Sequence, residues 1–360
     1  MAAYRYLLSS VPTGTLIAEL PFESATYDHV LNAPGSFGGT LGLKQPAKLA
    51  SVLAPLLSPQ TNSLGKLGLY VERDGVIVWG GLLWTARADL DAGTYELAGE
   101  GWLSYFRHRV MRESFSYPAT DQTSIAKNLM NNHQVWSGGG TLGISIADVQ
   151  PSGVLRDRFY LASERKEVGE AIEQLAAVEN GFNFRFESRW LSGALQTRFL
   201  TSYPVSGAPT TIVFDGQITS MKVSMDATTM ATNVDAIGTQ DASGDVLLAS
   251  VSDPAMLAVY PQYDAVVPAS DVSVLTTLDE HARRRLARGH APTVIPSIEV
   301  DPSQVPIVGT YQCGDAVRVR GGYGLAAVDG LYTITSYAVD VDDAGGEKGK
   351  IAFANEEVFG

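Results

Sequence analysis

Two glycine-containing segments are the first places where this sequence could bind a phosphate. Gly65-Lys66 matches the end of a phosphate-binding loop, but Gln60 stands where the loop needs its first glycine and Leu67 replaces the metal-binding hydroxyl. Gly138-Gly139-Gly140 would let a ligand approach the backbone, yet neither a preceding hydrophobic strand nor a helix start completes a dinucleotide fingerprint. We therefore interpret the first segment as lacking nucleotide-binding function and the second as a loop.

Acidic residues near the C-terminus resemble a calcium loop at three positions. Asp340, Asp342 and Gly345 fit the template, whereas Ala344 and Ile351 occupy places where oxygen ligands are required. We interpret this segment as a solvated hairpin turn.

The residues that usually serve in catalysis form no recognisable pattern. The chain has five histidines: His29, His108, His133, His281 and His290. None belongs to a His-Glu-x-x-His pair, and no serine occupies a Gly-x-Ser-x-Gly elbow. The single cysteine, Cys313, excludes internal disulfides and multi-cysteine metal sites, and no signature of a thiol nucleophile surrounds it. We predict a protein that is not an enzyme, with no metal site and no cofactor. A pair of carboxylates for glycoside cleavage stays an open alternative, because such a pair is defined by its distance in space and not by its spacing in the sequence.

The charge balance argues against a nucleic-acid-binding protein. A formal net charge of −13 opposes tight binding to phosphate backbones, although it suits solubility or a surface along which DNA passes without sticking. Asp279 and Glu280 lie one turn from a cluster of arginines on an expected helix: Arg283, Arg284, Arg285 and Arg288. We interpret this helix as salt-bridged or subunit-facing. No stretch of about 18 apolar residues predicts a membrane-spanning helix, and residues 1–11 show no signal-peptide pattern.

Short strands separated by turns dominate the first hundred residues. Residues 67–72 and 76–84 flank an Asp-Gly turn, which is a strong hairpin signal. Residues 4–8 with 16–20, and 27–31 with 37–43, predict two further strand pairs. We expect an N-terminal barrel-like β domain over residues 1–105.

Helices enter after this β-rich region. Asp121 is a candidate cap for a short helix, and residues 166–179 carry an apolar stripe that ends before Gly181. Phenylalanines alternate with polar residues over 182–187, which predicts a half-buried strand. We expect an α+β domain over residues 106–210, then a second barrel-like β domain with one long helix over 211–360. The fold class is therefore α+β, mostly β.

Several segments resemble minor tail proteins of siphophages that infect actinobacteria. They are residues 1–21, 31–37, 69–81 and 100–102. The most telling part is Val71-Glu72-Arg73-Asp74-Gly75, followed by Val78-Trp79-Gly80-Gly81. The order of domains, ending in Gly314-Asp315 and paired strands, is also similar to the baseplate hub family.

This resemblance implies a structural protein of the virion, located at the phage tail tip and assembled in the host cytoplasm. The family forms a homotrimeric ring in which two barrel-like domains per subunit continue the hexameric symmetry of the tail tube. The implied partners are the distal tail protein, the tail tube, the tape-measure protein and tip fibre or spike proteins, with duplex DNA only in transit. The ring would join the tube to the tip and form or gate the DNA channel. The resemblance assigns no interface residue.

Two alternative functions stay open at this stage. A carbohydrate-binding tail-tip module would use exposed Trp102, Trp136 or Trp190 to stack on sugars of the host cell wall. A cell-wall hydrolase would need an acid and a base that the sequence does not reveal. We expect Trp79 in the core, whereas Trp102 is open between core and interface.

Overall fold

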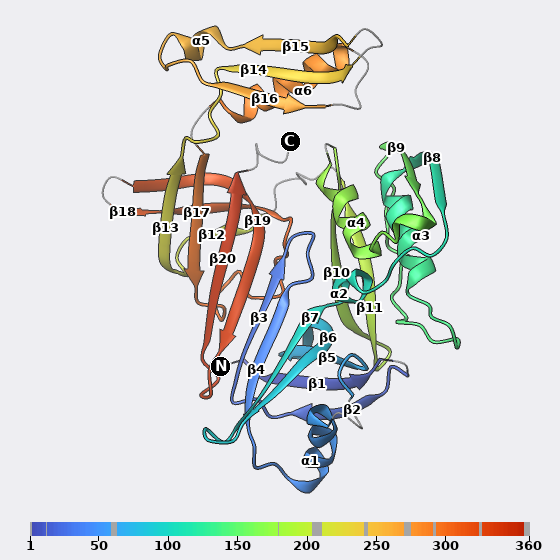
Figure 1. Ribbon diagram of the computed structural model, residues 1–360. Coiled ribbons are helices and arrows are strands. Elements are labelled where there is room, and N and C mark those ends of the chain that lie inside the picture. The colour runs from blue at the N-terminus through green and yellow to red at the C-terminus, as the bar shows by residue number, and fades with distance from the viewer. Residues whose placement is uncertain are drawn as a thin grey trace. The chain divides into compact units, whose positions relative to one another are not determined.

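The computed structural model describes residues 2–11, 13–58, 63–178, 180–203, 211–240, 244–269, 275–290, 293–323 and 326–355. The chain divides into two compact units, of which the smaller is Lys222–Pro296 (Figure 1). Most of the described elements are strands, and these strands pair into sheets. The predicted fold class, α+β and mostly β, is therefore confirmed. The division into domains at residues 105 and 210 stays a prediction.

An N-terminal lobe of antiparallel strands begins the larger unit. Its strands are β1 (Tyr4–Ser10), β2 (Leu16–Leu20), β3 (Ser24–Val30), β4 (Ser36–Gly42), β5 (Leu67–Arg73), β6 (Val76–Asp89) and β7 (Thr94–Gly101). They lie in the order β3-β4-β7-β6-β5-β1-β2. The predicted Asp-Gly hairpin is confirmed as β5 and β6, because Asp74 and Gly75 adopt the positive φ angles that this tight turn needs. A short helix, α1 (Ala47–Leu53), and a 3-10 turn, η1 (Ala54–Leu57), lie between β4 and β5.

Aromatic rings fill the core of this lobe. Tyr6, Phe22, Phe37 and Trp79 form a chain of ring contacts with centroids 5.1–6.1 Å apart. Trp79 is buried, as predicted, and its indole N–H donates to the Asp28 carbonyl at 3.1 Å. Aromatic packing of this kind stabilises a small β core beyond its buried area.

The C-terminal lobe uses strands from the end of the chain. They are β12 (Val213–Phe214), β13 (Ile218–Asp226), β17 (Thr293–Val300), β18 (Ala316–Tyr323), β19 (Ala326–Val341) and β20 (Glu347–Asn355). The order is β13-β17-β20-β19, and β18 pairs with both β19 and β12. Phe214, Tyr311, Tyr337 and Phe353 pack edge-on in its centre.

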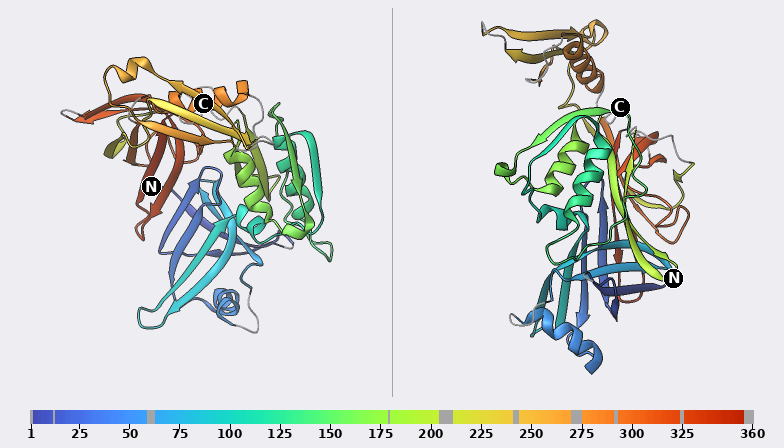
Figure 2. Two further views of the ribbon diagram at one scale, coloured as in Figure 1. Left: turned by 45° about the horizontal axis from the view of Figure 1, so that its top comes forward. Right: turned by 90° about the vertical axis from the view of Figure 1, so that its right-hand side faces the viewer.

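The segment that lies between these two lobes in the sequence forms helices and two pairs of antiparallel strands (Figure 2). We call this segment the α+β layer. The elements are α2 (Leu103–Arg107), β8 (Phe115–Asp121), α3 (Gln122–His133), β9 (Leu155–Tyr160), η2 (Ala162–Glu164), α4 (Val168–Ala177), β10 (Asn183–Leu191) and β11 (Ala194–Ser202). The predicted apolar stripe of α4 is confirmed, since its members Val168, Ile172 and Leu175 are buried with Phe184 and Phe199 in one cluster. Residue 179, the predicted helix end, lies outside the described residues.

Asp121 joins two segments of this layer. Its Oδ1 accepts hydrogen bonds from the backbone N–H groups of Thr123 and Ser124 at 3.0 and 3.2 Å, so it caps α3 as predicted. Its Oδ2 accepts from Ser152 Oγ at 3.0 Å and from the Gly153 N–H at 2.7 Å. Burial alone would raise the pKa of Asp121, but these hydrogen bonds outweigh it and lower the pKa below the ordinary 3.8.

Replacing Asp121 with alanine is expected to lower the free energy of unfolding by about 1–2 kcal/mol at pH 7, because a helix cap is lost. A lowered folded-state pKa stabilises the protein above the unfolded-state pKa, and this stabilisation is lost as the pH falls through the folded-state value. The difference between wild type and variant should therefore shrink below pH 3.8. Urea unfolding at pH 7, 5 and 3 measures it, with Asp343→Ala at an exposed turn as control. A difference that stays constant down to pH 3 would contradict this assignment.

The smaller unit contains a three-stranded sheet with helices. The elements are β14 (Asn233–Gln240), β15 (Val246–Ser252), α5 (Pro254–Leu257), β16 (Asp264–Pro268) and α6 (Leu275–Arg288). The centre strand β14 pairs antiparallel with β15 and parallel with β16. Helix α6 confirms the helix that the sequence predicts from about residue 271 to residue 288, of which residues 271–274 lie outside the described residues. Within the described part of the chain, no helix has the length and apolar character needed to cross a membrane.

Candidate functional site at the seam between the two lobes

A pair of strands far apart in the sequence joins the two lobes. β3 and β19 pair antiparallel, from Ala25 opposite Val341 to Val30 opposite Ser336 (Figure 1). Each strand would otherwise be the open edge of its own lobe, and an unpaired edge invites association with other chains. The pairing, which we call the seam, makes one continuous sheet from β13 to β2.

Buried rings line the inner side of the seam. His29 of β3 stacks on Tyr337 of β19 with ring centroids 4.7 Å apart, and its Nε2 lies 2.7 Å from the Val78 carbonyl oxygen. Burial is the main cause that lowers the pKa of His29, despite its hydrogen bond to Val78. The imidazole is therefore neutral at pH 7, so its Nε2–H donates to Val78. The stacking and the hydrogen bond fix the ring in place.

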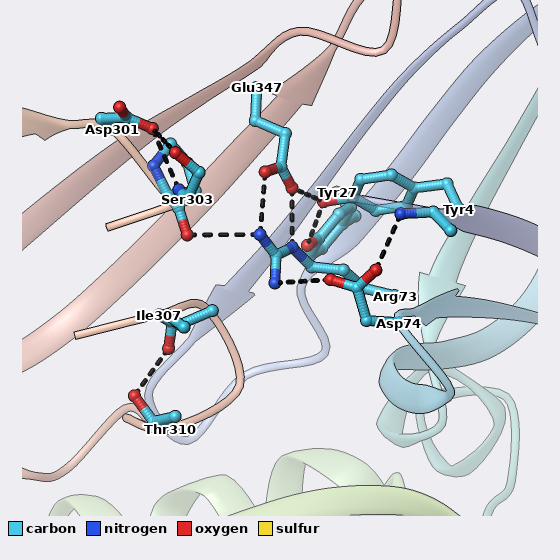
Figure 3. Close-up of polar contacts among 11 residues, drawn as sticks. Tyr4, Tyr27, Arg73, Asp74, Asp301, Ser303, Ile307, Thr310 and Glu347 are labelled. Carbon is cyan, nitrogen blue, oxygen red and sulfur yellow. Dashed lines mark hydrogen bonds and ion pairs between the residues drawn. The ribbon is translucent and has the colours of Figure 1, made fainter. Parts of the chain in front are cut away.

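A buried ion pair connects the lobes a short distance from the seam (Figure 3). Arg73, at the end of β5, donates from Nε and Nη2 to the two carboxylate oxygens of Glu347, at 2.7 and 2.8 Å. The side chains of Arg73 and Glu347 are only 6% and 4% exposed. Arg73 Nη2 also donates to the Pro302 carbonyl at 3.3 Å, and Nη1 lies 3.3 Å from Asp74 Oδ2. Two parallel charge-assisted bonds of this kind fix orientation as well as distance.

Two tyrosines complete this ion pair. The Tyr4 hydroxyl donates to Glu347 and lies 3.4 Å from the Tyr27 hydroxyl (Figure 3). Burial is the largest cause that raises the pKa of Tyr4 well above its ordinary value, followed by the bond to Glu347. The carboxylate of Glu347 thus accepts from one arginine and one tyrosine of the N-terminal lobe. We call Tyr4, Tyr27, Arg73 and Glu347 the clamp.

The outer side of the seam carries small and polar side chains. One row across the strands holds Asp340, Thr26, Gly38 and Ala98, and Thr26 Oγ1 donates to Asp340 Oδ1 at 2.8 Å. Because these side chains are short, the surface contains an open trough of about 450 Å³. Its lining consists of Ser24, Ala25, Thr26, Gly38, Gly39, Thr40, Thr85, Arg87, Glu96, Leu97 and Ala98. We call this surface of β19, β3, β4, β7 and β6 the seam face.

Solved structures with a similar fold along nearly the whole chain include tail proteins. The tail protein from Neisseria meningitidis MC58 matches with a TM-score of 0.60 and 16% identity, over 98% of both chains. The 43 kDa tail protein of prophage MuSo2 from Shewanella oneidensis matches with a TM-score of 0.67 and 12% identity, over 99% of both chains. An E. coli component of the type VI secretion system, described as similar in structure to the T4 tail proteins gp27 and gp5, matches with a TM-score of 0.52 and 8% identity, over 99% of this chain and 76% of its own.

This chain has the phage tail protein fold. The resemblance seen in the sequence is therefore confirmed at the level of the fold. A scan against protein-family models finds no match, and neither does a search of the curated proteins. At these low identities the likeness concerns backbone arrangement, and one fold can serve different functions.

Two of the residues that the sequence singled out for chemistry, Cys313 and Asp342, have structural roles. Cys313 is buried, and burial raises the pKa of its thiol to about 12, so it is not a reactive thiolate at neutral pH. Asp342 accepts from the Ala344 and Gly346 N–H groups at 3.0 and 2.6 Å, which confirms a hairpin turn. Over the described ranges, no group of three or more His, Cys, Asp or Glu residues is placed to hold a metal ion.

The tryptophans considered for sugar stacking are largely covered. Trp102 is 3% exposed and donates to Ser188, so the open question of its place is decided in favour of the core. Trp190 is half-buried and donates to Glu72 Oε2 at 2.6 Å. Trp136 is half-buried under the backbone of Gly140, where an added Cβ would lie 2.1 Å from the indole. The exposed indoles that the carbohydrate-binding hypothesis needs are therefore not found at these positions.

The clamp is the functional feature that sequence reasoning missed. Arg73 belongs to the motif that carried the family resemblance, and an arginine at the end of an otherwise buried strand was a signal for a hidden partner. Nothing in the sequence pairs it with Glu347, which lies in another lobe. Of the arginines on α6, which the sequence led us to interpret as salt-bridged or subunit-facing, Arg283 lies 2.7 Å from Asp279 Oδ2.

Proposed function

We propose that this chain is a structural, non-enzymatic protein of a phage tail hub, three copies of which form a ring. The observation that carries the proposal is the seam, which fuses two β-sheet lobes of one chain into a single sheet. Three such subunits would present six lobes, which is the number needed to continue a hexameric tail tube. Closed rings are a common way for a chain with exposed strand edges to assemble.

The clamp supports this role because a hub must hold its two lobes at a fixed spacing. A bidentate pair between Arg73 and Glu347, both nearly excluded from water, restrains the lobes more tightly than a surface ion pair would. Any subunit that contributes two neighbouring lobes to one ring benefits from this rigidity, since a hinge there would break the symmetry.

We assign the seam face to the wall of the channel through the ring. Its central row of side chains is short, and the charges on it are of both signs: Arg87, Glu96 and Asp340. Asp340 also forms an ion pair with Lys350 of the adjacent strand β20. Such a surface, in a chain with a net charge of −13, gives duplex DNA no continuous basic path to bind. The remaining surfaces would meet the distal tail protein, the tail tube, the tape-measure protein and tip fibres or spikes in the virion.

Negative-stain imaging of the purified protein, with its solution mass, tests the proposal. We expect a threefold ring around a central channel, alone or after mixing with tail-tube or distal tail protein. A monomer that never forms rings under either condition would overturn it. Binding to purified host cell-wall glycan by that monomer would instead favour the carbohydrate-binding function.

A further inference from the structure

The smaller unit leaves one face of its sheet open. Side chains alternate between the two faces of each strand, so Val234, Ala236 and Ala249 are buried against α6. Their neighbours Ile237 and Leu248 point to the other side, and Leu248 is 53% exposed. Single exposed apolar side chains are common, but several that lie together on a surface mark a contact site.

The strand register brings the exposed apolar residues together. Ile237 lies opposite Leu248 of β15 and opposite Pro268 of β16. Val266, which is 57% exposed, lies on the same face of β16, two residues before Pro268. Val246 lies two residues before Leu248 on β15. We call this surface the open sheet face.

The open sheet face is acidic at one end. Asp235 lies opposite Ser250 and Val266, and Asp264 lies opposite Asn233; both carboxylates are exposed. The hydrogen bonds of Gln262 and Asn233 lower the pKa of Asp264, which is therefore ionised at neutral pH. The sequences of β14, β15 and β16 contain no Lys or Arg. The face thus combines an apolar centre with negative charge, and its three strands supply no base.

Helix α6 shows which kind of element the opposite face of this sheet accepts. Its apolar residues Leu278 and Ala282 lie on the sheet, and its C-terminal end lies beside the start of β14, where the Gly289 carbonyl accepts from the Ala231 N–H. Basic groups gather at this end, since Arg285 donates to the Thr229 carbonyl and His290 lies 2.9 Å from Asp253. An amphipathic helix is therefore the element that covers the opposite face of this sheet.

We propose that the open sheet face binds an amphipathic helix of a partner protein, with Lys or Arg beside Asp235 and Asp264. The apolar stripe of that helix would cover Ile237, Leu248 and Val266, which would complete a helix-sheet-helix arrangement. Two copies of this chain do not fit each other here, because pairing their open sheet faces would bury the carboxylates of both without a base. The proposal does not depend on trimer formation or on the channel.

The test uses the full chain and a designed helical peptide. The peptide has leucines along one stripe and lysines in its last two turns, and a second peptide carries glutamate in place of every lysine. We expect the lysine peptide to bind and Leu248→Asp to weaken binding about tenfold, which corresponds to about 1.4 kcal/mol. The matched control is Leu275→Asp on α6, since Leu275 is also 53% exposed and lies on the helix that covers the opposite face. The pair Asp235→Asn and Asp264→Asn should weaken binding and reduce its salt dependence.

Fluorescence anisotropy measures binding, and thermal unfolding checks that each variant is folded. Equal binding of the lysine and glutamate peptides, or equal effects of Leu248→Asp and Leu275→Asp, would overturn the proposal. So would the absence of binding by the lysine peptide at millimolar concentration. Self-association of the chain that Leu248→Asp abolishes would also overturn it, since a second copy would then be the occupant.

Discussion

Replacing Arg73 with methionine is expected to lower the free energy of unfolding by about 3–5 kcal/mol, because it leaves the Glu347 carboxylate buried without its cation. Methionine keeps an unbranched apolar side chain of similar length, so the cavity is small and the loss reports the uncompensated charge. The Glu347 side chain is 4% exposed. In the variant, Tyr4 is the one residue of the N-terminal lobe, among those that the structure describes, that still donates a hydrogen bond to it. Urea unfolding at pH 7 measures the change.

The double variant Arg73→Met with Glu347→Met separates charge from packing. Replacing both partners of a buried ion pair by apolar residues is often neutral, so the double variant should recover most of the loss. Asp340→Ala serves as a matched control, because Asp340 forms an ion pair with Lys350 at 3.4 Å on the partly exposed seam face. Equal losses in the single and double variants would show that the clamp contributes packing alone. A loss below about 1 kcal/mol in Arg73→Met would place the pair with ordinary surface ion pairs.

Replacing Gly101 with alanine is expected to cost about 3 kcal/mol, because the new methyl group has no space. A Cβ at Gly101 would lie 1.8 Å from the Pro34 carbonyl oxygen, which is backbone and cannot turn away. The Gly101 N–H also donates to the Gly35 carbonyl at 3.2 Å, so β7 must end close to the turn between β3 and β4. All of the nearest atoms belong to the Pro34 backbone, so an added methyl group fits only if β7 and this turn move apart.

Gly38→Ala is the matched control, since Gly38 lies in the neighbouring strand β4 with no atom within 4 Å of an added Cβ. Its stability should change by less than about 1 kcal/mol, because alanine loses less entropy on folding than glycine. Thermal or urea unfolding of both variants gives the comparison. A Gly101→Ala variant as stable as Gly38→Ala would refute the close approach of β7 to the turn at Pro34.

Local signals in the sequence were sufficient where neighbouring residues decide the structure. The turn at Asp74-Gly75 requires backbone angles that few residues adopt, so the hairpin of β5 and β6 could be predicted. The stripe of α4 and the cap at Asp121 are equally local, because they depend on residues three or four positions apart. The hairpin turn expected at Asp342 is also local, since the residues that form it lie within a few positions of one another.

The sequence by itself therefore determined the strand-rich class, the hairpins, the main helices and the resemblance to tail proteins, because each rests on short-range patterns. Only the tertiary structure decided that β3 pairs with β19, that Arg73 meets Glu347, and that Trp102 is buried. Those contacts join residues that are distant along the chain, and alternation along one strand does not specify which other strand will cover its edge. The sheet of the smaller unit shows the same limit, because the parallel pair of β14 and β16 has no local turn to announce it.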